Sequence, residues 1–485
     1  MIHSFEFCQK NVGEIGTVTA VKDFIVKIAG LSGATIGEGI TFANEEHGRV
    51  MAVEGDSVVA LVLGTVPIEP GTKAGRTGNP ISISAGEGLL GHIIDTVGHS
   101  LSDRRHKSAD PEKRPLEVSP AGIAKRARIS RFFETGVVVT DLLIPLGAGQ
   151  RELVIGDRQS GKSHFLRQVM LSQAQSGKVG IYCAIGKRKT EIKAIEEFLE
   201  KYKIFKNCIL VAADSNSSPG EIYIAPYTAM TLAEYFCDRG RDVFLILDDM
   251  TTHAKYYREI SLLLERFPGR ESYPGDIFHV HSKLLERAGN FQLSVNGTGK
   301  QKTDNRTVSI TCLPVAESVG GDLTGYIQTN LMSMTDGHLY FDSELFFQGR
   351  RPPINIFLSV TRVGRQTQSP LLRDLGFQIL RFLKNYSDMQ RFMRFEMELS
   401  PEIQLTLHRG SRLTEFFNQV GNRIIPVAVQ VYIVALIWLE RFPDGNYETI
   451  LSNYCEKPAF KKQLEGLMKK AKTFEELLDE VRKIK

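Results

Sequence analysis

The stretch ELVIGDRQSGKSHFLRQVML, residues 152–171, decides the fold. It contains the pattern G-x-x-x-x-G-K-S, which follows a short apolar run and precedes apolar residues at helical spacing. A strand, a glycine-rich loop and a helix in this order form a loop whose backbone N–H groups surround phosphate oxygens. We therefore predict a phosphate-binding loop made of Gly156, Asp157, Arg158, Gln159, Ser160, Gly161, Lys162 and Ser163.

Two side chains of this loop and one carboxylate elsewhere have predicted chemical roles. Lys162 would reach the terminal phosphates, and the hydroxyl of Ser163 would bind Mg²⁺. The run DVFLILDDM, residues 242–250, is typical of a buried strand that ends in Asp248 and Asp249. Such an ending is usually only a turn, but in a chain with a phosphate loop it favours a cation site. Asp248 would then hold Mg²⁺ directly or through water.

The sequence on either side of the loop changes character twice. Residues 1–84 contain short alternating apolar runs with frequent glycines, which predict a small β-barrel. Residues 85–366 alternate buried-strand runs with helical stretches, which predict a mostly parallel sheet with helices on both faces. Residues 367–485 show helical spacing of apolar residues and predict a helical domain. The predicted fold class is therefore α/β, with a barrel before the sheet and helices after it.

Composition argues against several classes of function. With 24% charged residues and a net charge of only +4 over 485 residues, the chain gives no support for a nucleic-acid or membrane-surface role. Its six cysteines form no C-x-x-C pair, which favours reduced thiols in a reducing compartment. The start lacks the apolar stretch of a signal peptide, and the most apolar run, residues 424–439, is too short to cross a bilayer. Any membrane role would therefore come through a partner.

A family resemblance rests on strings that run through most of the chain. GQRELVIGDRQSGKS, residues 149–163, resembles the phosphate loop of alpha subunits of F-type ATP synthases. Further alpha-like strings, in the family's order, are SLLLERFPGRESYPGD (261–276), ELFFQGRRPPIN (344–355), SVTRVG (359–364) and HRGSRLTEFF (408–417). The resemblance extends from about residue 13 to about residue 435, so the chain is identified as a divergent member with a short N-terminus. It implies that the central P-loop domain is RecA-like.

The resemblance implies a nucleotide site that does not hydrolyse. In catalytic beta subunits the strand after the phosphate-loop helix leads to a Glu that polarises the attacking water, and alpha subunits carry Gln there. In this chain Lys187, in the segment YCAIGKRKTEIK, takes the position. Lysine is protonated near neutral pH and then accepts no proton. We therefore expect the chain to bind ATP or ADP with Mg²⁺ without turnover, and Lys187 to contact a phosphate or to form a salt bridge.

The resemblance also implies a pocket for the purine base. It implies that the base is surrounded by Gln159, Phe346, Arg351 and Gln419. Ordinary core packing explains Phe346 equally well. The segment NQVGNRIIP, residues 418–426, looks two residues longer than its family counterpart, so the second C-terminal contact has no clean match and Asn422 is only a guess.

One residue is expected to act on a neighbouring subunit. Arg362 in SVTRVG matches the Arg that alpha subunits place in the beta catalytic site as an arginine finger, and Ser359 stands three residues before it. The alternative is a surface Arg in a salt bridge. Elsewhere, His279 and His281 form an H-x-H pattern, but no third ligand is nearby in sequence, so we predict no metal site there.

The resemblance implies an assembly of several chains. The chain would alternate with catalytic beta-type subunits, three plus three, around a central-stalk gamma-type subunit. Through this complex it would lie at the cytoplasmic face of the membrane and act with an ion-translocating sector that carries H⁺ or Na⁺; no nucleic-acid partner is expected. The first twelve residues do not resemble an amphipathic helix, so the usual stator contact is expected to be absent or rebuilt.

Two other functions stay open. A catalytic homohexameric ATPase of the export type would need Glu in place of Lys187. A hexameric RNA translocase would need aromatic and basic residues along the barrel strands. The barrel segment carries Phe24 and Phe42 but no such pattern.

Overall fold

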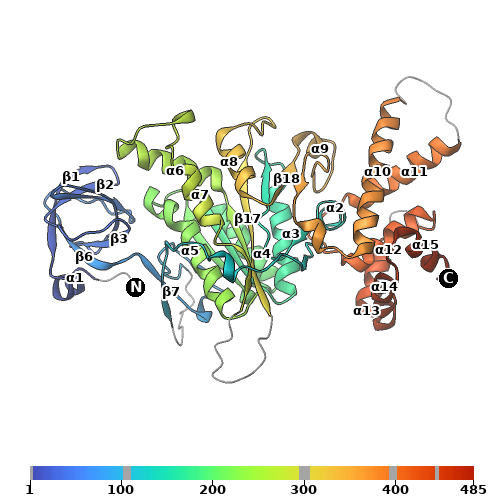
Figure 1. Cartoon of the computed structure of the whole chain (residues 1–485), viewed down its shortest axis with the longest axis horizontal. Coiled ribbons are helices and arrows are strands. Elements are labelled where there is room, and N and C mark those ends of the chain that lie inside the picture. Colours follow the sequence, from blue (N-terminus) through green and yellow to red (C-terminus); the bar gives the residue numbers. More distant parts are fainter. Residues whose placement is uncertain (1–3, 102–110, 294–305, 393–400, 443–446, 485) are drawn as a thin grey trace. The chain divides into compact units, whose positions relative to one another are not determined.

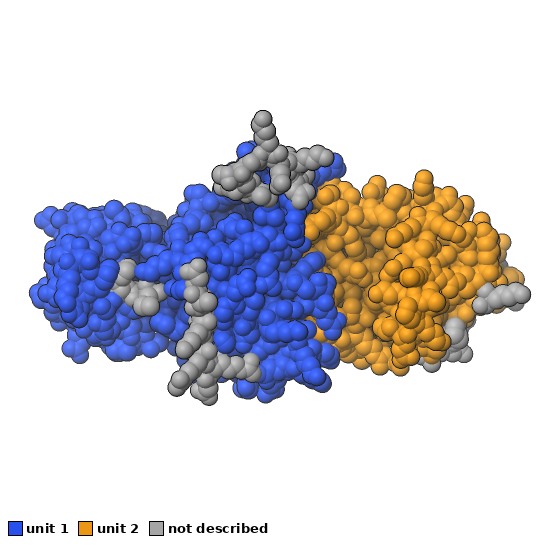
Figure 2. Space-filling model, turned by 90° about the horizontal axis from the view of Figure 1, so that it is seen from below, with its two compact units in different colours: residues 1–128, 174–318, 322–335 blue, residues 129–173, 319–321, 336–485 orange. Residues whose placement is uncertain are grey.

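The computed structural model describes residues 4–101, 111–293, 306–392, 401–442 and 447–484. They belong to two compact units (Figure 2). Unit 1 consists of residues 1–128, 174–318 and 322–335, and unit 2 consists of residues 129–173, 319–321 and 336–485. The units cut across the predicted boundaries near residues 84 and 366, and these boundaries stay predictions.

Unit 1 begins with a closed barrel of six strands (Figure 1). The strands pair antiparallel in the order β1-β2-β5-β4-β3-β6, and β6 closes the ring by pairing with β1. Their bounds are β1 (Ile15–Lys22), β2 (Ile25–Ala29), β3 (Glu38–Phe42), β4 (His47–Glu54), β5 (Ser57–Val62) and β6 (Lys73–Pro80). The barrel predicted from the alternating pattern is confirmed.

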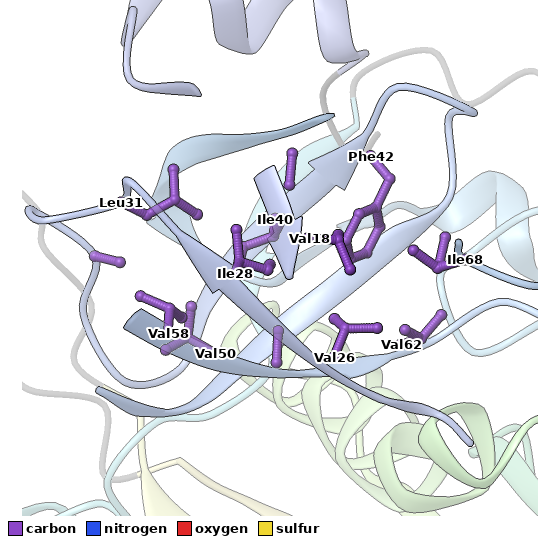
Figure 3. Packing of buried hydrophobic residues seen from close by; sticks show 13 residues of the cluster. Val18, Val26, Ile28, Leu31, Ile40, Phe42, Val50, Val58, Val62 and Ile68 are labelled. Atoms are coloured by element: carbon purple, nitrogen blue, oxygen red, sulfur yellow. The ribbon is translucent and has the colours of Figure 1, made fainter. Parts of the chain in front are cut away.

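Apolar side chains fill the interior of the barrel (Figure 3). Val26 and Ile28 of β2 are both fully buried, and every second residue of β5 (Val58, Ala60 and Val62) belongs to the same cluster, while Val59 and Leu61 between them are buried outside it. This period of two is the reason that the interior is apolar, because successive side chains of a strand point to opposite faces. Burial of each large aliphatic side chain contributes about 1.5–3 kcal/mol.

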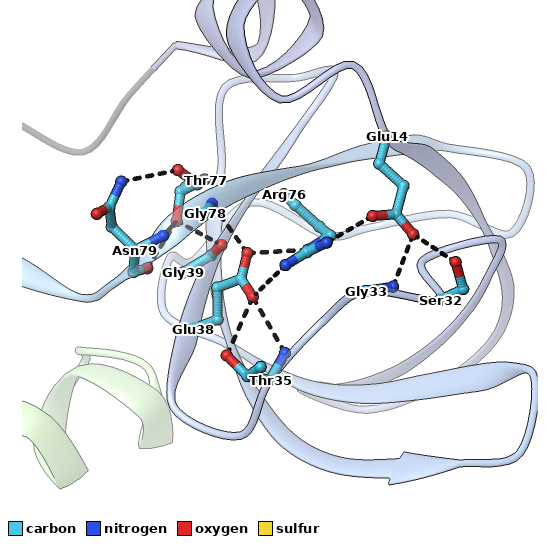
Figure 4. Close-up of polar contacts among 10 residues, drawn as sticks. All are labelled: Glu14, Ser32, Gly33, Thr35, Glu38, Gly39, Arg76, Thr77, Gly78 and Asn79. Atoms are coloured by element: carbon cyan, nitrogen blue, oxygen red, sulfur yellow. Dashed lines mark hydrogen bonds and ion pairs between the residues drawn. The ribbon is translucent and has the colours of Figure 1, made fainter.

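A buried ion-pair network supports one side of the barrel (Figure 4). Arg76 of β6 donates from Nε and Nη2 to the two oxygens of Glu38, each at 3.0 Å, and from Nη1 to Glu14 Oε2 at 2.5 Å. Glu38 also accepts hydrogen bonds from the backbone N–H groups of Thr35 and Gly78. The side chain of Glu38 is only 2% exposed, so its charge depends on these partners.

The first residues form a short helix that the sequence analysis did not expect. Helix α1 (Phe5–Asn11) begins after Ser4, whose hydroxyl accepts a hydrogen bond from the N–H of Phe7. Cys8 of this helix is fully buried against β6, where a Cβ added to Gly75 would lie 2.8 Å from the Cβ of Cys8. A helix of seven residues is marginal on its own, so packing against the barrel stabilises it.

The rest of unit 1 is built on a parallel sheet with the strand order β8-β14-β13-β15-β17. Its strands are β8 (Ile93–Ile94), β13 (Val179–Lys187), β14 (Cys208–Asp214), β15 (Val243–Asp248) and β17 (Thr307–Glu317), and β16 (Gly289–Gln292) pairs antiparallel with β17. The pair β7 (Ser82–Ala85) and β9 (Glu112–Pro115) lies outside this sheet. The prediction of a mostly parallel sheet is confirmed.

Helices connect the parallel strands of unit 1. They are α4 (Lys189–Lys201), α5 (Pro219–Asp238), α6 (Met250–Leu263) and α7 (Ile277–Leu285), and the further helix α8 (Tyr326–Met334) follows β17. The N-terminus of α5 has a capping box in which Ser218 and Glu221 satisfy each other's backbone N–H groups, with Pro219 at the first helical position. These connections bring the carboxyl ends of β13 and β15 side by side.

Unit 2 carries the phosphate-loop segment and the C-terminal helices. Strand β12 (Leu153–Gly156) pairs parallel with β18 (Gly337–Phe341), and β18 pairs antiparallel with β19 (Val360–Thr361). The pair β10 (Phe132–Phe133) and β11 (Leu146–Gly147) is antiparallel. The helices are α2 (Val138–Leu143), α3 (Lys162–Gln175), α9 (Ser343–Phe347), α10 (Pro370–Phe392), α11 (Pro401–Phe417), α12 (Val427–Trp438), α13 (Tyr447–Glu456), α14 (Pro458–Lys470) and α15 (Phe474–Arg482).

The prediction of a helical C-terminal part is confirmed by helices α10 to α15. Helix α12 is buried on almost every side, which explains why its sequence is the most apolar run of the chain. Among the described helices, none combines the length and the apolar composition that crossing a bilayer requires.

Candidate functional site

The predicted phosphate loop connects β12 to α3 in unit 2. Its backbone turns through positive φ values at Gln159 (60°) and Gly161 (92°), a conformation that a non-glycine residue rarely adopts. Asp157 ties the loop to two segments that are distant in sequence. Its carboxylate accepts hydrogen bonds from the N–H of Gly321 at 3.0 Å and from the hydroxyl of Ser343 at 3.0 Å. The loop leads into the N-terminus of α3, a helix of 14 residues. Backbone N–H groups and the helix dipole at this N-terminus favour an anion.

The polar side chains of the loop divide into anchors and exposed groups. Lys162 is 8% exposed, and its ammonium donates to the carbonyls of Gly156 at 2.7 Å and Asp157 at 2.6 Å. Ser160 is buried and donates its hydroxyl to the Asp157 carbonyl at 2.7 Å. Arg158, Gln159 and Ser163 are exposed. The structure thus brings the eight predicted residues together in one loop, with the hydroxyl of Ser163 exposed at the first turn of α3.

Two of the predicted base contacts lie next to the loop. A Cβ added to Gly161 would lie 3.8 Å from the ring of Phe346 and 3.4 Å from Pro353. The guanidinium carbon of Arg351 lies 3.8 Å from the centroid of the Phe346 ring, a cation–π contact, and Arg351 Nη1 donates to the carbonyl of Phe346 at 2.8 Å. Phe346 is only half-buried. It is therefore a partly open aromatic face beside the loop rather than an ordinary core residue.

Gln419 is buried and its amide is bonded to backbone groups. Its Oε1 accepts the N–H of Val138 at 3.2 Å, and its Nε2 donates to the carbonyls of Gly136 and Arg423. In this structure the amide thus holds the segment 418–426 against the start of α2, and a contact with a base stays a prediction. Asn422 lies in the same segment and is half-buried.

The same segment also contacts the helix that follows the phosphate loop. The carbonyl oxygen of Gly421 lies 3.0 Å from His164 Nε2 and accepts a hydrogen bond from Gln168 Nε2 at 3.0 Å. His164 and Gln168 stand one turn apart on α3, so they present their side chains on one face. Neither residue belongs to the phosphate-loop motif, and the only sequence signal that pointed toward them was the unusual length of residues 418–426.

In unit 1, the carboxyl ends of β13 and β15 join Lys187 to two aspartates. Lys187 Nζ lies 2.8 Å from Asp248 Oδ1 and 3.8 Å from Asp249 Oδ2. The other oxygen of Asp248 accepts the hydroxyl hydrogen of Tyr182, and Asp249 Oδ1 accepts the N–H of Thr252 at the start of α6. Of the two roles expected for Lys187, the salt bridge is therefore the one that the structure contains.

The surroundings of Lys187 keep it charged. Burial lowers the pKa of Lys187, but the attraction of Asp248 and Asp249 is stronger, and the pKa ends above its usual value. Burial raises the pKa of Asp249, while Lys187 lowers it. A protonated ammonium accepts no proton, so this position cannot activate water as a general base.

The two residues predicted to bind Mg²⁺, Ser163 and Asp248, differ in how their oxygen atoms are already bonded. The hydroxyl of Ser163 is exposed at the first turn of α3 and fits an oxygen ligand of Mg²⁺. Asp248 already has one carboxylate oxygen paired with an ammonium and the other with a phenol hydroxyl, and its contact with Mg²⁺, directly or through water, stays a prediction. Within the described residues there is no group of three or more His, Cys, Asp or Glu side chains that would hold a metal ion.

The two histidines of the H-x-H pattern, His279 and His281, differ in burial. His281 lies fully buried with its Nε2 3.1 Å from Nδ1 of His253, while His279 of the same helix is exposed. The two histidines of the pattern therefore face different surroundings, and the pattern forms no ligand pair.

Arg362 directly follows β19, in a segment of unit 2 that hydrogen bonds hold in place. Its N–H donates to the carbonyl of Asp336 at 2.9 Å. Ser359 accepts the N–H of Tyr340 at 2.9 Å and donates its hydroxyl to the carbonyl of Asn355 at 2.7 Å. The side chain of Arg362 is exposed.

Apolar side chains stand exposed beside Arg362. They are Phe357, Leu358 and Val360, with exposed fractions of 57%, 51% and 41%. Neighbouring exposed apolar residues of this size are typical of a surface that contacts another protein.

Comparisons with known proteins cover most of the chain. Residues 136–361 match the family model described as the ATP synthase alpha/beta family, nucleotide-binding domain, and residues 368–483 match the ATP synthase alpha/beta chain, C terminal domain. ATP synthase subunit alpha of Ruthia magnifica is 38% identical over 434 residues, which cover 88% of this chain and 83% of that protein. ATP synthase subunit alpha 2 of Legionella pneumophila is 35% identical over 480 residues, 94% of this chain and 92% of that protein.

Proposed function

The chain belongs to the ATP synthase alpha/beta family, and on this premise we propose that it is the non-catalytic, nucleotide-binding alpha-type subunit of a rotary F-type ATPase. The observation that carries the proposal is the ion pair of Lys187 with Asp248 at 2.8 Å. It puts a fixed positive charge at the position where catalytic members of the family carry the Glu that polarises water. The chain therefore binds a nucleotide and leaves hydrolysis or synthesis to its neighbour.

The nucleotide is ATP or ADP, bound by the phosphate loop of residues 156–163. Lys162 and the loop N–H groups hold the phosphates, and the hydroxyl of Ser163 is the ligand that this chain offers to an accompanying Mg²⁺. The cation neutralises phosphate charge when it is bound. Phe346 and Arg351 form the face on which the base stacks, Gln159 contacts the base, and Gln419 holds residues 418–426 against the start of α2.

The partners are catalytic beta-type subunits and a central-stalk gamma-type subunit. Three copies of this chain alternate with three beta-type chains, and Arg362 reaches the catalytic site of the adjacent beta-type chain. The exposed apolar side chains next to Arg362 and the backbone contacts of Ser359 support an interface at this place. The assembled ring works at the cytoplasmic face of a membrane and couples its chemistry to an ion-translocating sector for H⁺ or Na⁺.

Nucleotide retention and turnover of the full-length chain test this proposal. The purified chain is expected to retain ATP or ADP through gel filtration, and its turnover alone should stay far below the ~10 s⁻¹ of an ordinary enzyme. Lys162→Ala is expected to abolish retention, while the exposed Lys201→Ala serves as a matched control that leaves it unchanged.

Two results would replace the proposal with the other functions. Turnover by the chain alone at about 10 s⁻¹, lost in Lys162→Ala, would indicate a catalytic homohexamer of the export type. Turnover that rises strongly on addition of single-stranded RNA would indicate a translocase.

A further inference from the structure

A short piece of backbone, from Gln419 to Gly421, joins the predicted base contacts to the helix that follows the phosphate loop. At one end the backbone N–H of Gln419 donates to the carbonyl of Arg351 at 2.6 Å. At the other end the carbonyl of Gly421 lies 3.0 Å from His164 Nε2 and accepts a hydrogen bond from Gln168 Nε2 at 3.0 Å. All five residues belong to unit 2. Three consecutive residues span only a short distance, so the bonds at α3 restrict where the backbone of Arg351 can lie.

The carbonyl of Gly421 is turned toward α3 by the local backbone. Gly421 has a φ of 81°, in the left-handed region that glycine adopts more readily than other residues. A carbonyl oxygen has two lone pairs and donates nothing, so both side chains of α3 must donate to it. His164 therefore carries a hydrogen on Nε2, and the two donors together fill the capacity of this oxygen.

Gln168 is a polar residue at a position where packing alone would favour an apolar one. It is 0% exposed, and its Nε2 donates to the carbonyl of Gly421 and, at 3.4 Å, to that of Arg423. Its Oε1 is buried and accepts no hydrogen bond within the part of the chain that the structure describes. A buried amide oxygen without a partner costs free energy, which a leucine of similar volume would avoid. The bond that Gln168 donates is therefore the property that distinguishes it from a packing residue.

The other end of the same piece of backbone lies at the proposed face for the base. The guanidinium of Arg351 lies over the ring of Phe346, and this ring lies beside Gly161 of the phosphate loop. The bonds at α3 thus hold this face before a nucleotide arrives. A site that is ordered in advance loses less conformational entropy on binding, so it binds its ligand more tightly.

We propose that His164 and Gln168 are positioning residues of the nucleotide site, which hold Gly421 on α3 and thereby keep the face of Arg351 and Phe346 in place for the base. The inference rests on the proposed nucleotide site and deepens it, because neither residue belongs to the phosphate-loop motif or to the predicted base contacts. Their effect reaches the ligand through the base and not through the phosphates.

Four variants isolate these two donors. Gln168→Leu and His164→Leu each remove one donor, and their combination leaves the carbonyl of Gly421 without either. His164→Gln keeps an N–H donor of similar reach, so it is expected to behave as the wild type. As a matched control, Gln175→Leu makes the same change at the exposed last residue of α3.

The measurement is the dissociation constant of ATP and of tripolyphosphate, which has no base, for the full-length chain by calorimetric titration in Mg²⁺. The double variant is expected to bind ATP at least about fivefold more weakly, the effect of one or two neutral hydrogen bonds, with an unchanged affinity for tripolyphosphate. Each single leucine variant should lose part of this, and Gln175→Leu should lose nothing. The thermal unfolding midpoint of Gln168→Leu should be no lower than that of the wild type, which separates a positioning role from a stabilising one.

The contrary results have distinct meanings. A folded double variant that loses less than about fivefold in ATP affinity overturns the inference and leaves the proposed nucleotide site standing. Equal losses for ATP and tripolyphosphate also overturn it, because the two residues would then act on the phosphate loop. If the double variant fails to fold, Gln168→Leu alone decides, and an ATP affinity equal to that of the wild type overturns the inference. Absence of ATP binding by the wild-type chain overturns the proposed function itself.

Discussion

The guanidinium of Arg351 lies over the ring of Phe346, with its central carbon 3.8 Å from the ring centroid. The guanidinium is held in this position, because Nη1 also donates to the carbonyls of Phe346 and Arg350. Phe346 in turn lies next to Gly161 of the phosphate loop. An aromatic face with a fixed positive charge beside a phosphate loop is suited to the stacking of a purine.

Replacement of Arg351 with alanine is expected to weaken ATP binding by about 1–2 kcal/mol, because the ring of Phe346 loses its cation and its fixed orientation. Tripolyphosphate lacks a base, so its affinity should not change. Calorimetric titration of both ligands checks the prediction, and equal losses for the two would show that Arg351 acts on the phosphates instead.

Arg362→Ala and Arg362→Lys are expected to lower ATP hydrolysis by the reconstituted ring by at least about 100-fold, since a guanidinium from a neighbour stabilises charge that develops on the γ-phosphate. Nucleotide content at the chain's own site should stay unchanged. Arg365→Ala, an exposed arginine three residues later, is the matched control. If the Arg362→Ala ring kept more than about a tenth of the activity, a loss of at most about 1.4 kcal/mol in barrier, the finger role would be wrong.

Arg76→Ala is expected to destabilise the barrel by about 3–5 kcal/mol, because it leaves Glu38 buried without its cation. Hydrogen exchange of the β3 and β6 amides measures the change in local opening free energy. The combination Arg76→Ala with Glu38→Gln should recover part of the loss. Lys27→Ala breaks the exposed pair with Glu54 and should cost less than about 1 kcal/mol.

The buried pair of His253 and His281 is expected to make α6 less stable in acid. Burial lowers the pKa of His253 to about 4, and it also lowers the pKa of His281 well below its usual value. Between pH 6.5 and 4 the unfolded chain therefore binds protons that the folded chain does not, so stability falls as pH falls through this window. For His253 the loss between pH 7 and pH 5 is about 2 kcal/mol.

Hydrogen exchange of the α6 amides at pH 7 and pH 5, corrected for intrinsic rates, measures this loss. His253→Gln should reduce the pH dependence by the share of His253 and leave the share of His281, whereas replacement of the exposed His279 with glutamine should leave it as in the wild type. A pH dependence of unchanged size in His253→Gln would assign it to groups other than His253.

Local patterns predicted most of the fold because each depends on residues that are close in sequence. The alternation around Val26 and Ile28 predicts a barrel strand, and the apolar runs of residues 180–186 and 243–247 predict buried parallel strands. The phosphate loop was found because its eight residues are contiguous. In each case the structure contains the predicted element.

The features that the sequence did not predict depend on contacts between residues that are far apart in the sequence. Helix α1 forms because Cys8 packs against Gly75, which no pattern within residues 1–12 indicates. The choice of Lys187 between a phosphate and a salt bridge depends on the pairing of β13 with β15, which brings its ammonium to Asp248. The contacts of Gln419 depend in the same way on how residues 418–426 fold back on α2 and α3.

Closure of the barrel has a consequence for the chain before it meets its partners. Because β6 pairs with β1, the six strands leave no row of unpaired N–H and C=O groups along an edge. Open edges of this kind recruit strands from other molecules and begin aggregation. A newly made copy is thus protected from edge-to-edge association along its barrel strands, residues 15–80, and this barrel can contact another chain only through side-chain surfaces, not by strand exchange.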